Sequence, residues 1–70
     1  MTLCNRLKEM RVARNLTQEA LAQAVGVTRQ SIIAIEKGKY VPSVRLALEL
    51  AQALEAPLQA IFWLAEGEGR

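Results

Sequence analysis

The chain has 70 residues, of which 51% are hydrophobic, and it carries a formal net charge of +2. A chain of this length can build one hydrophobic core but has no room for an enclosed substrate cavity, and its sequence contains no His and no Asp. An enzyme, a metal site, a cofactor and a small-molecule substrate are therefore not expected, and no apolar run approaches the ~18 residues of a membrane span.

The first predicted helix covers about residues 2–13. Leu3, Leu7 and Met10 recur there at spacings of four and three residues, which is the period of an apolar helix face. Asn15 is expected to end this helix.

Two short helices joined by a sharp turn are predicted next. Thr17 is expected to cap the first of them, Gly26 allows the positive φ that the turn requires, and Thr28 is expected to cap the second. The second helix is expected to end at about Glu36. Small and apolar residues are placed to fill the angle between the two helices: Ala22, Val25, Val27, Ile32 and Ile35. This spacing is typical of a helix-turn-helix.

A fourth helix is predicted to begin after Pro42, with Ser43 as its cap. Pro57 is expected to be the first residue of a fifth helix that continues through Leu64. The inward stripe of the fourth helix is expected to consist of Leu46, Leu50 and Leu54.

The sequence shows no strand-like alternation, so we predict an all-α, compact five-helix bundle. Residues 1–65 are expected to form this single domain, and residues 66–70 are expected to be a frayed tail. The one cysteine, Cys4, is expected to be a partly buried residue of the first helix. A single cysteine without a signal-like segment indicates a cytoplasmic protein.

Charge is distributed unevenly along the chain. Residues 1–45 contain eight basic and three acidic side chains, whereas residues 46–70 contain one basic and four acidic ones. A polyanion would be attracted by the first part and repelled by the second. Taken alone, this split also fits ordinary solvated charges.

Three short segments carry a family resemblance: LTQEALA at residues 16–22, GVTRQSI at 26–32 and IEKGK at 35–39, followed by Pro-Ser and an apolar helix. Together they resemble the lambdoid phage repressor and Cro-type helix-turn-helix family, also called the xenobiotic-response-element family, over roughly residues 5–64. The resemblance implies a regulator, most simply a repressor, that binds double-stranded DNA of the nucleoid with its third helix in the major groove.

Four residues of the third helix are predicted to read base edges. A step of about 100° per residue places Gln30 and Ala34 on the outward arc, Ile33 at its flank and Arg29 at the helix tip. Gln can pair with adenine, Arg with guanine, and apolar groups with thymine methyls. The alternative for Arg29 and Gln30 is a solvated first turn, and Ile33 must pack on DNA or leave apolar surface wet.

Residues at the rim of the motif are predicted to contact phosphates without reading sequence. The N-terminus of the second helix suits a phosphate, and the resemblance places a backbone contact at Gln18. Backbone N–H groups around residues 38–40 are expected to add to it. The remaining predicted phosphate contacts are Ser31, Lys37, Lys39, Tyr40, Ser43 and Arg45.

The resemblance also implies a partly buried ion pair between Arg11 on the first helix and Glu36 on the third. We assign these two residues to architecture rather than to DNA contact.

A homodimer on an inverted repeat is implied because one recognition helix reads only ~4–6 base pairs. Its interface is expected at Leu58, Trp63 and Leu64 of the fifth helix, while Ile61 and Phe62 serve the core of the monomer. Alternatively, Trp63 merely covers the end of the bundle.

Two other classes of function remain open. The same bundle can serve as a protein-interaction module or as an antitoxin that holds a toxin. The uneven charge and the polar tip of the third helix argue against a pure adaptor, and an enzyme is the least favoured alternative.

Overall fold

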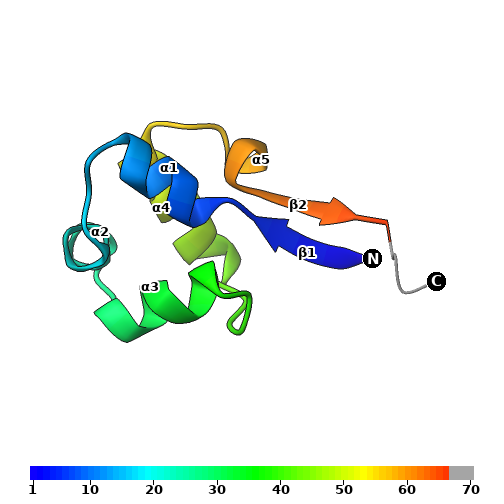
Figure 1. The fold of residues 1–70 in the computed structure, drawn as a ribbon, viewed down its shortest axis with the longest axis horizontal. Helices are drawn as coiled ribbons and strands as arrows, with labels where there is room; N and C mark the ends of the chain where they lie inside the picture. The colour runs from blue at the N-terminus through cyan, green and yellow to red at the C-terminus, as the bar shows by residue number, and fades with distance from the viewer. Residues whose placement is uncertain (67–70) are drawn as a thin grey trace.

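Five helices and one two-stranded ribbon make up the computed structural model, which describes residues 1–66 (Figure 1). The helices are α1 (Leu7–Ala13), α2 (Gln18–Val25), α3 (Arg29–Glu36), α4 (Val44–Leu54) and α5 (Leu58–Ile61). The strands are β1 (Thr2–Asn5) and β2 (Phe62–Ala65). The predicted five-helix bundle with its helix-turn-helix, formed by α2 and α3, is confirmed.

Side-chain caps begin three of the helices, as predicted. The hydroxyl of Thr17 accepts a hydrogen bond of 3.0 Å from the amide of Ala20, and Thr28 accepts one of 3.2 Å from the amide three residues later. Ser43 caps α4 in the same way at 3.1 Å. Each bond satisfies a backbone N–H that the first helical turn leaves unpaired, so the local sequence fixes where these helices begin.

Residues in the left-handed conformation end α2 and turn the chain after α1. Gly26 has a φ of +76° between α2 and α3, and Asn15 has a φ of +59° after α1. A Cβ placed on Gly26 would meet no atom within 4 Å. The turn therefore favours glycine because of its backbone conformation and not because of crowding.

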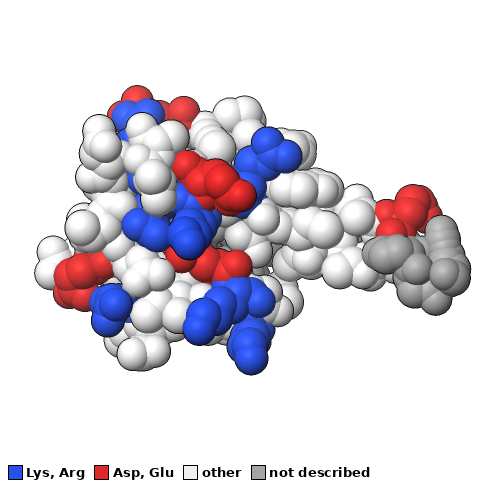
Figure 2. Space-filling view, viewed as in Figure 1, with Lys and Arg blue, Asp and Glu red and all other residues white. Residues whose placement is uncertain are grey.

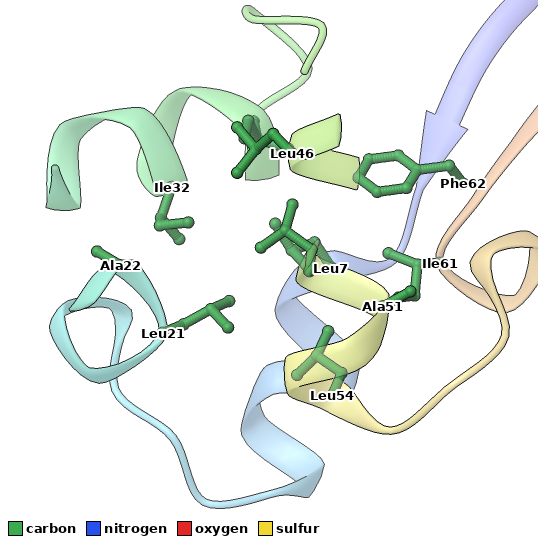
Figure 3. Packing of buried hydrophobic residues seen from close by; sticks show 11 residues of the cluster. Leu7, Leu21, Ala22, Ile32, Leu46, Ala51, Leu54, Ile61 and Phe62 are labelled. Carbon is green, nitrogen blue, oxygen red and sulfur yellow. The ribbon is translucent and has the colours of Figure 1, made fainter. Parts of the chain in front are cut away.

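The hydrophobic core lies where α2, α3 and α4 meet, and α1 and α5 close it (Figure 3). Ala22 is almost completely buried and lets α3 approach α2 closely. Ile61 and Phe62 are buried, as predicted for the core of the monomer. The largest fully buried side chains are Leu7, Leu21, Ile32, Ile35, Leu50, Leu54 and Ile61. The predicted inward stripes of α3 and α4 are thus confirmed.

The first helix is shorter than predicted because its expected first turn is a strand. Residues 2–5 form β1, and α1 begins only at Leu7. Asn5 accounts for the difference: its Oδ1 accepts a hydrogen bond of 3.0 Å from the Leu7 amide, and its Nδ2 donates one of 3.1 Å to the carbonyl of Ile35. Such side-chain bonds compete with helix formation. Cys4 consequently lies half-buried in β1 and not on a helix.

The fifth helix is also shorter than predicted. Pro57 has an extended ψ of 147° and precedes α5, which ends at Ile61 and not at Leu64. The chain then continues as β2, which pairs antiparallel with β1 and places Trp63 opposite Cys4. The expectation of a strand-free chain was wrong for this ribbon, because its two strands lie at opposite ends of the sequence and are too short to show a period.

The ribbon projects from one side of the helical bundle, so residues 2 and 65, which pair at its outer end, lie at that side (Figure 1). At its base, the Arg6 amide donates a 2.9 Å hydrogen bond to the carbonyl of Ile61. None of the helices within residues 1–66 has the length and apolar character needed to cross a membrane. The predicted tail lies outside the described residues from position 67 onward.

Candidate DNA-binding interface

The first turn of α3 points its polar side chains into solvent. Arg29 and Gln30 are exposed, whereas Ile32 and Ile35 on the opposite side of the helix are buried in the core. Within residues 1–66, neither Arg29 nor Gln30 has a side-chain hydrogen bond or an ion pair. Their donors are therefore available to an external partner.

The other predicted contacts on α3 are less exposed. Ala34 on the outward arc and Ile33 at its flank are both half-buried. Ser31 is also half-buried, and its Oγ lies 3.2 Å from Oγ1 of Thr28, so this hydroxyl takes part in the cap of α3. An apolar strip thus runs beside the polar first turn.

The last turn of α3 is held by a buried ion pair. Arg11 Nε lies 2.7 Å from Glu36 Oε2, and the two side chains are only 10% and 6% exposed. Arg11 Nη1 also donates a 2.7 Å hydrogen bond to the carbonyl of Leu16, and Gln18 Nε2 donates one of 3.1 Å to Glu36 Oε1. The pair that the resemblance implied is present, and it joins α1, the start of α2 and the end of α3.

This arrangement changes the expected part of Gln18. Its side-chain NH₂ is committed to Glu36, so a phosphate at this end of α2 would be met chiefly by backbone N–H groups. The sequence did not indicate this contact, because Gln18 and Glu36 are on different helices and no local sequence pattern links them.

The loop after α3 presents basic side chains but not the expected backbone donors. Lys37 and Lys39 are exposed, and Figure 2 shows Lys and Arg side chains gathered along this edge of the molecule. The amides of Gly38 and Lys39 donate 2.9 Å hydrogen bonds to the carbonyls of Ile35 and Ala34. The expected backbone contacts are therefore wrong for these two residues, because both N–H groups close the helix end.

Two predicted phosphate contacts lie at the start of α4. Ser43 uses its hydroxyl oxygen to cap the helix, and Arg45 Nε lies 3.2 Å from Glu49 Oε2 in an exposed pair. Tyr40, in the preceding loop, is exposed. The positive charge of Arg45 is thus partly balanced by a neighbour one turn along α4.

The structure separates the residues predicted for a dimer interface. Leu58 lies on α5 and packs against the core, whereas Trp63 and Leu64 lie on β2. Neighbouring residues of a strand point to opposite faces, so Trp63 and Leu64 cannot contribute to one continuous helix face as expected. The guanidinium of Arg6 lies 4.9 Å from the centre of the Trp63 ring. This contact, like the bonds of Asn5, was missed because β1 was predicted to be helical.

No metal site is formed within residues 1–66: no three His, Cys, Asp or Glu side chains lie together there. All buried side-chain nitrogen and oxygen atoms in this part of the chain have a hydrogen-bond partner.

Comparison with known proteins identifies the fold. The Helix-turn-helix family HTH_3 matches residues 7–61. The chain is 50% identical over 64 residues to the uncharacterized HTH-type transcriptional regulator MJ0272 of Methanocaldococcus jannaschii, covering 91% of this chain and 97% of that protein. It is 48% identical over 62 residues to the uncharacterized HTH-type transcriptional regulator YgzD of Bacillus subtilis, covering 89% and 94%.

A solved structure has a similar fold over most of the chain. The restriction-modification controller protein C.AhdI from Aeromonas hydrophila is 35% identical to the chain and superposes with a TM-score of 0.73, covering 77% of this chain and 82% of that one. The family match, the named relatives and the geometry of α2 and α3 agree: the chain belongs to the HTH_3 family of XRE/Cro-C1-type helix-turn-helix transcriptional regulators.

Proposed function

We propose that the protein represses transcription in the cytoplasm by binding, as a homodimer, an inverted-repeat operator in the double-stranded DNA of the nucleoid. The observation that carries this proposal is the contrast within α3. Its first turn offers the exposed donors of Arg29 and Gln30, which no group of the described part of the chain pairs with, while its last turn is fixed to the bundle through Glu36. A recognition helix must be held in a fixed position by the rest of the protein and must have hydrogen-bond donors available at its N-terminal end.

Base reading is assigned to the outward side of α3. The Gln30 amide can bond N6 and N7 of an adenine together, and the Arg29 guanidinium can bond O6 and N7 of a guanine. Ala34 and Ile33 offer apolar groups to thymine methyls, which would also cover the apolar strip that α3 leaves partly exposed.

Phosphate anchoring is assigned to the rim around α3. Lys37, Lys39 and Tyr40 follow the helix with exposed side chains, and the first backbone N–H groups of α2, at Gln18, face a phosphate from the other side. Ser31, Ser43 and Arg45 complete the proposed set. A dimer would then neutralise ~6–10 phosphates, so its affinity should fall steeply with salt.

The experiment that tests the function is selection of bound sequences from a random DNA pool, followed by footprinting on the selected sequence. The expected result is an inverted repeat with half-sites about one helical turn, ~34 Å, apart. A single protected half-site at saturation would contradict the dimer. Binding that does not respond to salt would contradict DNA binding and favour the protein-interaction alternative.

A further inference from the structure

The outer face of α4 carries an apolar stripe that the DNA-binding site does not use. Val44 and Leu48 lie one turn apart and are 76% and 51% exposed. A shallow groove follows this stripe and is lined by residues of α4 and of the turn into α5, among them Ala51, Ala56 and Leu58. Exposed apolar side chains that line a groove make it a candidate interaction site in a small protein.

Charged side chains of opposite sign border opposite ends of the groove. Arg45 lies at the N-terminal end of the stripe, and Glu49 and Glu55 lie towards its C-terminal end. The two carboxylates make the groove a poor surface for DNA. They suit a partner that brings a cation to the C-terminal end and a carboxylate to the N-terminal end.

A second copy of this chain meets that requirement. In a two-fold pairing, α4 of one copy runs antiparallel to α4 of the other, so the same patch contacts itself and unlike ends meet. With the two-fold axis near Leu48, Leu48 packs on its own counterpart and Val44 lies beside Gln52 of the second copy. Arg45 then comes within about one helical turn of Glu49 and Glu55 of the second copy. Within residues 1–66 of one copy, these charges form only exposed pairs, Arg45 with Glu49 and Glu55 with Arg14, which the second copy can share. A parallel pairing would instead place like charges side by side.

We infer that this face of α4, completed by Leu58, is the surface through which two copies form the dimer. The inference rests on the proposed function, which requires a dimer, and adds to it the surface through which the two copies make contact. Of the three residues that the sequence predicted for the interface, only Leu58 belongs to this surface. Trp63 and Leu64 of the ribbon define the competing surface. No residue of α3 lines the groove, so a second copy here leaves Arg29 and Gln30 open to DNA. Arg45, which the proposed function assigns to a phosphate, borders the groove, and the inference reassigns it to the dimer.

The first test is Leu48→Glu, which places a charge in the centre of the stripe. Val12→Glu is the matched control, because Val12 is 54% exposed on α1 and does not line the groove. Sedimentation equilibrium is expected to show a dimer dissociation constant at least ~30-fold higher for Leu48→Glu, as for a central contact residue, and an unchanged one for Val12→Glu. Circular dichroism checks that both variants are folded.

The second test uses a cross-link and does not depend on destabilising the protein. In a Cys4→Ser background, Leu48→Cys should be captured as a covalent dimer by a short bismaleimide, because residue 48 lies near the two-fold axis. Val12→Cys should remain a monomer on denaturing gels. Efficient cross-linking at position 12 but not at 48 would overturn the inference.

The outcomes for the inference and for the proposed function are separable. If the wild type is a dimer that binds an inverted repeat, but Leu64→Glu dissociates it and Leu48→Glu does not, the ribbon is the interface and the inference is wrong while the function stands. If the wild type binds one half-site as a monomer at all concentrations, the dimer of the proposed function fails as well.

Discussion

The first and last turns of α3 treat polar side chains in opposite ways. At the last turn, both carboxylate oxygens of Glu36 are bonded, one to Arg11 and one to Gln18, inside the protein. At the first turn, Arg29 and Gln30 extend into solvent, and no side chain of residues 1–66 pairs with them. This helix therefore satisfies its polar groups internally at the end that is fixed to the bundle, and leaves them open at the end where a ligand can supply the bonds.

The largest effect is expected from removing Glu36. Glu36→Ala would leave the buried guanidinium of Arg11 without its charge partner, which should lower the free energy of unfolding by ~3–5 kcal/mol in urea denaturation. Arg14→Ala is the control, because its pair with Glu55 is exposed at 42% and 72% and should contribute less than ~1 kcal/mol. Equal losses for the two variants would show that the last turn of α3 is not specially anchored.

A smaller effect, seen in DNA binding and not in folding, is expected at the first turn. Arg29→Ala or Gln30→Ala should weaken binding to the best operator by ~1–3 kcal/mol and relax the preference at one or two base positions. The measurement is a binding titration on the operator and on single-base variants of it. If both substitutions weakened binding to operator and random DNA alike, α3 would not be reading bases.

The smallest effect is expected from the loop that follows α3. Lys39→Ala should lower affinity by the same factor on every sequence and reduce the slope of log affinity against log salt by about one, because one phosphate contact is lost. Binding titrations at several salt concentrations check this. A change in base preference would mean that Lys39 reaches into the groove and that reading extends beyond α3.

The helical part of the fold could be predicted because its signals are local. Thr17, Thr28 and Ser43 each cap a helix through an amide three residues away, so the pattern is visible in a short window of sequence. The outward position of Arg29 and Gln30 follows equally directly from helical geometry.

The features that could not be predicted from the sequence depend on contacts between segments that are distant along the chain. The pairing of β1 with β2 joins the two ends of the described chain, and the bond from Gln18 to Glu36 joins two helices; neither leaves a periodic trace in the sequence. The backbone donors near Gly38 were misjudged for a different reason. A glycine just past a helix end signals that the following amides turn back to the last carbonyls, and that signal was present.

The bond between Asn5 and the carbonyl of Ile35 connects the ribbon to the recognition helix. A two-stranded ribbon is marginal by itself, so this one is expected to open locally more often than the bundle, exchanging its amide hydrogens early. Binding of α3 to DNA would reduce the motion of the Ile35 carbonyl, which accepts the hydrogen bond from Asn5. The amides of β1 should then exchange more slowly in the complex. Their exchange rate would thus report DNA binding by α3, although β1 itself is not part of the proposed DNA-binding site.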